Sequence, residues 1–153
     1  MTGWLKALLV IATVLVILII ASLGVGAVWF LRNREALKAQ AKEAAAEGRN
    51  FGLRSDNQGC VDEGALRYKK EPGLFNSLKY GSFIDGCLTT SRGTPGFCDH
   101  VPLGDLMKMA SWREAQCQRY DLANDRNCQG LLTPVMMFCG EKNRNQTNLV
   151  AAK

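Results

Sequence analysis

The sequence predicts an all-α protein with an N-terminal transmembrane helix and helical stalk, followed by a small disulfide-stapled domain of about four helices. Three observations lead to this prediction. Residues 7–31 are uncharged and mostly apolar, residues 32–47 are nearly all strong helix formers, and all six cysteines lie between Cys60 and Cys139. The segment that holds the cysteines has apolar residues at helical spacing and little of the alternation typical of strands.

Residues 7–31 have the length of a membrane span. Twenty-five helical residues extend over about 37 Å, whereas the hydrocarbon core of a bilayer is about 30 Å thick. Trp4 precedes the segment and Trp29 and Phe30 end it, as is typical of residues at a membrane interface. We therefore expect contact with the lipid bilayer through residues 7–31. Two alternatives are a cleaved signal peptide, for which Val25-Gly26-Ala27 offers the small residues of a cleavage site, and the buried helix of a soluble protein.

Two signals disagree on the orientation of this span. One basic side chain, Lys6, precedes it, and the positive-inside rule favours a cytoplasmic location for the more basic C-terminal flank. That flank contains Arg32, Arg34, Lys38 and Lys42. Six cysteines in a small domain instead indicate an oxidising compartment. We give the cysteines more weight, so the prediction is a single-pass protein of the cell (inner) membrane with residues 1–6 in the cytoplasm and the C-terminal domain periplasmic or extracytoplasmic.

The chain after the span divides by composition. Residues 32–47 should continue the helix as a stalk that Gly48 ends, and residues 48–59 have the Gly, Asn and Asp content of a linker. Stalk and linker thus occupy residues 32–59, and the six-cysteine domain occupies residues 60–139. Residues 140–153 are polar and lack periodicity, which predicts a flexible tail.

The first half of the domain should be a helical hairpin. Apolar residues share one face in each of two segments, and Pro72-Gly73 separates them. The inward residues are Val61, Ala65 and Tyr68 in the first segment and Tyr80, Ile84, Cys87 and Leu88 in the second, which runs from about Phe75 to Thr90.

The second half should be another pair of helices. One is expected from near Pro102 to about Tyr120, and the other begins at Asn124-Asp125 and is kinked or restarted at Pro134. The residues expected to point inward are Leu103, Leu106, Met107, Ala110 and Cys117 in the former and Cys128, Leu131, Leu132, Val135 and Cys139 in the latter.

Antiparallel hairpins also predict how the cysteines pair. The start of one helix lies beside the end of the next, and the turn brings the flanking residues together. The expected disulfides are Cys60 with Cys87, Cys98 with Cys139, and Cys117 with Cys128. Each should stabilise a core that is small for a domain of this size.

No motif indicates a catalytic site, a cofactor or a metal. Cys98 and His100, the one histidine, offer the best alternative, an envelope thiol redox factor or enzyme. However, no Cys-x-x-Cys pair is present, and the 10 to 26 residues between successive cysteines do not give the paired spacing of zinc ligands. Residues 60–139 carry nine basic and nine acidic residues, so no basic patch for nucleic acid is visible either.

Large apolar residues suggest a binding function. The last two helical segments contain more of them than one helix face can bury, which is typical of an interface with another protein. The candidate partner surface consists of Met107, Met109, Trp112, Arg113, Met136, Met137 and Phe138. The sequence therefore predicts a non-enzymatic, membrane-anchored module that binds another envelope protein.

Overall fold

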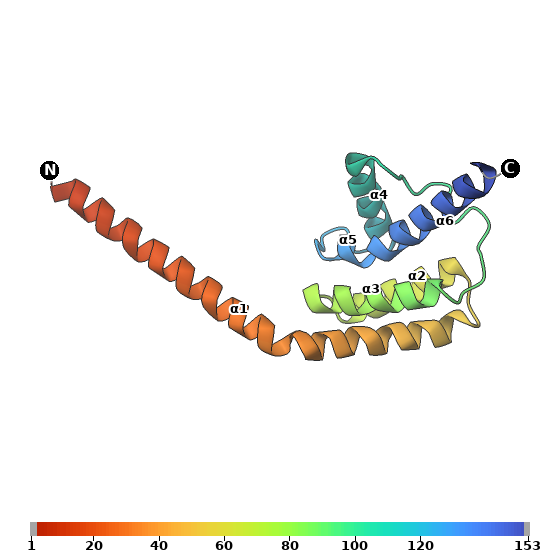
Figure 1. Ribbon diagram of the computed structural model, residues 1–153, viewed down its shortest axis with the longest axis horizontal. Helices are drawn as coiled ribbons and strands as arrows, with labels where there is room; N and C mark the ends of the chain where they lie inside the picture. The colour runs from red at the N-terminus through yellow and green to blue at the C-terminus, as the bar shows by residue number, and fades with distance from the viewer. Residues whose placement is uncertain (1–2, 152–153) are drawn as a thin grey trace. The chain divides into compact units, whose positions relative to one another are not determined.

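The protein is all-α, as predicted. The computed structural model describes residues 3–151, without the side chains of residues 5–7, 9, 29–30 and 145–151, and over this range it has six helices and no strand (Figure 1). The helices are α1 (Gly3–Gly52), α2 (Asn57–Lys70), α3 (Leu74–Leu88), α4 (Leu106–Arg119), α5 (Cys128–Leu131) and α6 (Thr133–Ala151).

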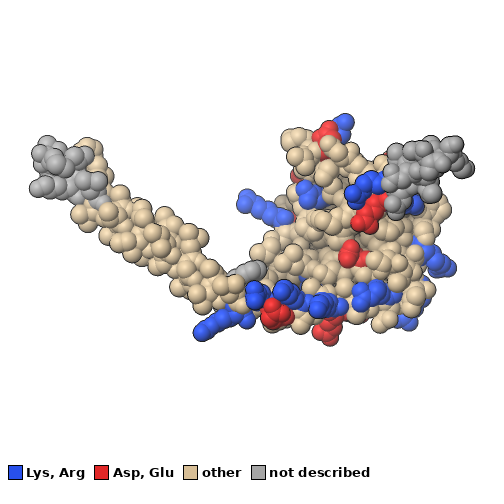
Figure 2. All heavy atoms as spheres, viewed as in Figure 1, with Lys and Arg blue, Asp and Glu red and all other residues tan. Residues whose placement is uncertain are grey.

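The chain forms two compact units, Met1–Lys38 and Ala39–Lys153. The first contains the apolar part of α1, in which Val10–Val28 is long and apolar enough to cross a membrane and is not buried within the protein. Figure 2 shows no charged side chain along this part of α1 where it is described. The side chains of Lys6, Trp29 and Phe30, which the sequence places at the two ends of the span, lie outside the described part of the structure.

The second unit begins within α1, earlier than the domain boundary expected from composition. The expected stalk does not end at Gly48, because α1 continues to Gly52, and the expected linker is reduced to the four residues between α1 and α2. The glycines pack α1 directly against α3. A β-carbon at Gly48 would overlap the carbonyl of Phe83, and one at Gly52 would meet the carbonyl of Cys87. Both glycines therefore permit close packing of two helices, and Gly48 does not end one.

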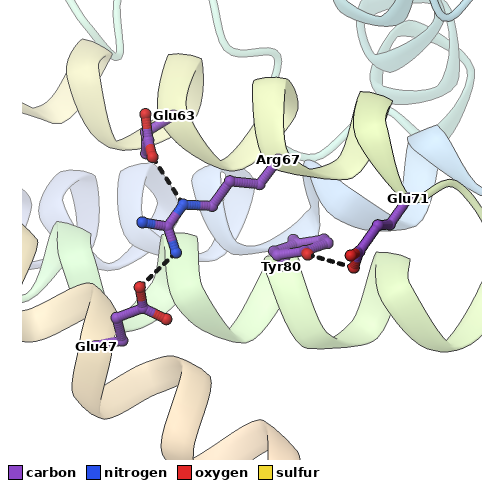
Figure 3. A network of polar contacts seen from close by, with 5 residues as sticks. All are labelled: Glu47, Glu63, Arg67, Glu71 and Tyr80. Carbon is purple, nitrogen blue, oxygen red and sulfur yellow. Dashed lines mark hydrogen bonds and ion pairs between the residues drawn. The ribbon is translucent and has the colours of Figure 1, made fainter.

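A network of charged and aromatic side chains also links α1 to the domain (Figure 3). Arg67 of α2 donates to Glu47 of α1 at 2.6 Å and to Glu63 at 2.7 Å, and its guanidinium lies 4.4 Å from the ring centre of Phe83. Burial of Arg67 opposes its charge, but the bonds to the two carboxylates outweigh this effect and raise its pKa. One side chain thus connects α1, α2 and α3.

Helices α2 and α3 form the predicted first hairpin. Asp56 caps α2 by accepting a hydrogen bond from the amide of Gly59 at 2.8 Å, and the reversal at Gly73, with φ of +138°, separates the two helices. All seven residues expected to point inward are buried, namely Val61, Ala65, Tyr68, Tyr80, Ile84, Cys87 and Leu88.

The second half of the domain differs from the prediction at three places. Helix α4 begins at Leu106 and not near Pro102, because Asp105 accepts from the amides of Met107 and Lys108 at 3.0 and 3.1 Å and so caps the helix there. The last helical region begins at Cys128 and not at Asn124-Asp125, and it restarts at Pro134 as expected, with α5 ending at Leu131 and α6 beginning at Thr133. The polar residues expected to be a flexible tail continue α6 as far as Ala151, and residues 152–153 lie outside the described range.

Three disulfides connect these helices, and they join the pairs that the hairpin argument predicts. They are Cys60–Cys87, Cys98–Cys139 and Cys117–Cys128, with Cα–Cα distances of 5.6, 5.4 and 6.0 Å. The first links α2 to α3, the second links the loop after α3 to α6, and the third links α4 to α5. Five of the six cysteines lie in one core with Tyr68, Phe83, Ile84, Leu131 and Leu132, and the half-buried Cys98 packs against it.

Candidate partner-binding surface

Helix α4 is the least buried helix of the domain. Among its fourteen residues, only Cys117 is fully buried, and the Cys117–Cys128 disulfide joins this end of the helix to α5. At its N-terminal end, the Asp105 side chain accepts from two amides of the helix itself and makes no bond to another helix through this cap. Helix α4 therefore leaves most of its own surface exposed.

The first turn of α4 exposes large apolar side chains. Leu106 and Met107 are each 79% exposed, and Leu103 just before them is 40% exposed. The sequence predicts that all three point inward, and this prediction is wrong: Leu103 precedes the helix, and Leu106 and Met107 form its exposed first turn. Leu106 precedes the half-buried Met109 by three residues, so the two share a face of α4, but the rest of the domain leaves Leu106 uncovered.

Further along α4, Met109 and Trp112 are half-buried and pack against the core. Trp112 lines a cavity of about 220 Å³ together with Gln116 and Arg119 of the same helix. The opposite wall comes from the loop after α3, which contributes Phe97, His100 and Val101, and from Val135 of α6. The lining residues include the basic Arg119 but no acidic residue, so the cavity suits an apolar group that carries neutral or negative polar atoms.

A half-buried polar network connects the other end of α4 to α2. The Tyr120 hydroxyl donates to Asp62 at 2.7 Å, and the Gln58 amide donates to the same carboxylate at 2.9 Å. Burial, and then the hydrogen bond to Asp62, raise the pKa of Tyr120 far above its ordinary value. Gln58 also lines the cavity, so the network fixes one of its walls.

The structure divides the seven residues of the predicted partner surface. Met107 and Met137 are 79% and 63% exposed, as a contact surface requires. Met136 is only 8% exposed and belongs to the core, so it is not available to a partner. The remaining four, Met109, Trp112, Arg113 and Phe138, are half-buried. Phe138 packs edge-on against Phe97 at 6.2 Å between ring centres, so it acts mainly within the domain.

Leu106 and Leu103 were missed as surface residues. The signal that finds them is Asp105, a preferred N-cap residue followed by a run of good helix formers. Pro102 is also a residue typical of the first turn of a helix. The helix was therefore predicted to start near Pro102, four residues before its actual start at Leu106.

Cys98 and His100 line different cavities. Cys98 is bonded to Cys139 and lines a cavity of about 370 Å³ with Asp99 and Lys142, whereas His100 lines the cavity beside Trp112. Over the described residues, no group of three or more His, Cys, Asp or Glu side chains is placed to hold a metal.

Comparison with protein-family models, curated proteins and solved structures finds no match to the chain.

Proposed function

We propose that the protein is a single-pass membrane-anchored module whose extracytoplasmic domain binds another envelope protein through the first turns of α4. The apolar segment Val10–Val28 supplies the anchor, and the three disulfides favour an oxidising compartment for the domain. The exposure of Leu106 and Met107 carries the binding part of the proposal.

Helix α4 leaves two large apolar side chains uncovered in its first turn. Burial of a Leu or Met side chain stabilises a protein by about 1.5–3 kcal/mol. Leu106 and Met107 are exposed, so the domain alone does not obtain this stabilisation from either of them. The cavity beside Trp112 lies on the same helix, so an apolar side chain of the partner can enter it while Leu106 and Met107 cover the partner's surface. Such a combination of exposed apolar side chains and a pocket is typical of protein-binding surfaces.

Site-specific photocrosslinking in living cells tests this proposal. A benzophenone amino acid at Met107 should give a discrete crosslinked product, and the same amino acid at Leu53 serves as the control. Leu53 is 71% exposed and lies between α1 and α2. The product should disappear when Leu106→Glu is combined with the probe at Met107. Equal products from both positions, or none from Met107, would contradict the proposal.

The location requires a separate test. Protease added to cells with a permeabilised outer layer should digest residues 50–153 if the domain lies outside the cytoplasm. Complete protection of these residues, together with free thiols, would reverse the orientation.

A second candidate is an envelope thiol redox factor that uses the Cys98–Cys139 disulfide. The cavity next to this disulfide favours it, because Cys98 is only half-buried there. Thiol alkylation without reductant separates the two functions. A structural role predicts no labelled cysteine, whereas a redox role predicts that Cys98 or Cys139 is labelled in part of the molecules.

A further inference from the structure

An exposed apolar patch lies at the N-terminal end of α3. Leu74 and Leu78 are each 60% exposed, and Phe75 is 45% exposed. Leu78 follows Leu74 by four residues and Phe75 by three, so it neighbours both on the helix surface, and we call the three side chains the α3 patch. It is separate from the first turn of α4, to which the partner surface is assigned.

The packing of α1 against α3 determines which end of the domain carries the α3 patch. The two helices run side by side in the same direction (Figure 1). At their C-terminal ends, Gly52 meets the carbonyl of Cys87, and the Thr90 hydroxyl donates to the carbonyl of Arg49 at 2.8 Å. At their N-terminal ends, Gln40 and Asn76 line the same hollow. The α3 patch is therefore level with the first residues of α1 that belong to the domain.

A short covalent connection joins this end of the domain to the apolar span. Ten residues lie between Val28, where the apolar span ends, and Ala39, where the second unit begins. As a helix these residues extend over about 16 Å, of which the headgroup region of a bilayer accounts for roughly 6 Å. Of the two ends of the α1–α3 pair, the end with the α3 patch is therefore the one that this short segment connects to the span.

The surrounding charges are those that a lipid surface attracts. After the span, α1 carries Arg32, Arg34, Lys38 and Lys42 together with the acidic Glu35 and Glu43, so residues 32–43 have a net charge of +2. Arg34 and Lys38 both contact Glu35, at 3.4 and 3.2 Å. Lys70 lies next to the α2–α3 turn and is exposed. Apolar side chains flanked by Lys and Arg are the composition of a surface that lies in a membrane interface, where the cations contact anionic headgroups.

We infer that the α3 patch inserts into the lipid interface and rests the domain on the membrane surface, with anionic phospholipid as its partner. This inference depends on the membrane anchor of the proposed function. Leu74, Phe75 and Leu78 enter the headgroup–acyl boundary, and the basic residues of α1 pair with lipid phosphates. The domain is then held at two points, the span and the patch, and α4 is presented in a defined orientation to its partner.

Lipid photocrosslinking of the full chain tests this inference. The protein, with a benzophenone amino acid at Leu74 or at Leu78, is reconstituted into vesicles of phosphatidylcholine with phosphatidylglycerol, floated on a density gradient, irradiated and analysed by mass spectrometry. The control carries the probe at Leu53, which is more exposed but follows Gly52 at the opposite end of the α1–α3 pair. Because burial of one Leu favours the inserted state by about tenfold or more, lipid adducts should be about tenfold more abundant at Leu74 and Leu78 than at Leu53.

The same experiment tests the membrane anchor and the insertion of the α3 patch separately. Protein that does not float with the vesicles lacks the anchor, which overturns both proposals. Protein that floats but gives no excess of lipid adducts at Leu74 and Leu78 retains the anchor and overturns the patch alone. Adducts from these positions to protein instead of lipid also overturn it, because a second chain then covers the patch. Alkylation that labels no cysteine verifies that each probe variant keeps its disulfides and is folded.

Discussion

Gly86 of α3 lies against the backbone carbonyl of Ala45 in α1, so closely that a β-carbon at position 86 would overlap the carbonyl oxygen. Backbone atoms cannot move aside as a flexible side chain can. The segment that continues from the apolar span is therefore the first helix of the domain core, and it is not a free stalk.

Replacing Gly86 tests this packing. Gly86→Ala should lower the free energy of unfolding by about 1–3 kcal/mol, because the two helices must separate to admit the methyl group. Gly93→Ala is the matched control, since a β-carbon there meets no atom within 4 Å, and it should change stability by less than about 0.5 kcal/mol. Denaturant titration of the detergent-solubilised chain measures both, and equal stability of the two variants would place α1 outside the core.

The ion pair between Glu47 and Arg67 should contribute modestly to the same contact. Glu47→Gln is expected to cost about 0.5–1 kcal/mol, because the Glu47 side chain is 56% exposed and solvent screens the interaction. The cost should shrink in high salt. Glu43→Gln, one turn earlier on α1 and also exposed, is the control. If Glu43→Gln lowers the free energy of unfolding as much as Glu47→Gln does, the effect is not specific to the Glu47–Arg67 ion pair.

Alkaline pH should destabilise the domain through its tyrosines. Each of the three donates its hydroxyl to a carboxylate: Tyr68 to Asp125, Tyr80 to Glu71 and Tyr120 to Asp62. Burial and these bonds raise the pKa of all three in the folded state. A raised pKa means that the stabilisation is complete below about pH 10, the unfolded value, and is lost as the pH rises above it.

Tyr120→Phe isolates the largest of these effects. The substitution should cost about 1–2 kcal/mol near neutral pH, because Asp62 loses a buried donor. It should also flatten the decline in unfolding free energy above pH 10, as measured by denaturant titration at several pH values. An unchanged slope would mean that Tyr120 does not titrate differently in the folded and unfolded protein.

The stability lost on removing a disulfide should increase with the length of the loop that the disulfide closes. In the chain-entropy model, the Cys98–Cys139 bridge, with a separation of 41 residues, should contribute about 1 kcal/mol more than the Cys117–Cys128 bridge, with a separation of 11. Paired Ala variants at each bridge compare the two. Peptide mapping of the unreduced protein provides the connectivity, and a peptide that links Cys60 to any residue other than Cys87 would contradict the fold.

The parts of the fold that the sequence predicts are those with strong local signals. Val61, Ala65 and Tyr68 share a helical face and are buried, and the antiparallel hairpin that they form leads directly to the pairing of Cys60 with Cys87. The role of Gly48 was not predictable in this way. A glycine after a run of helix formers indicates a helix end, and only the position of α3 reveals that it serves as a contact.

The candidate site was predicted only in part, because some of its features have local sequence signals and others depend on tertiary packing. Met107 and Trp112 were identified as an excess of apolar residues on one helix, which composition alone reveals. Whether Met136 or Met137 reaches the surface depends on the rotation of α6 against α3, and this is a tertiary property. The cavity beside Trp112 has walls from segments as distant as Gln58 and Val135, so no local pattern could reveal it.

The native mass of the solubilised protein tests the central claim, binding of an envelope protein through α4, most directly. The chain has a mass of 16.8 kDa. Extracted in mild detergent from cells that make it at its natural level, it should elute in a complex larger than the monomer that contains a second protein. The Leu106→Glu, Met107→Glu double variant should elute as the monomer, whereas the control variant Leu53→Glu should remain in the complex. A wild-type protein that elutes alone, or a double variant that keeps the complex, would contradict the claim.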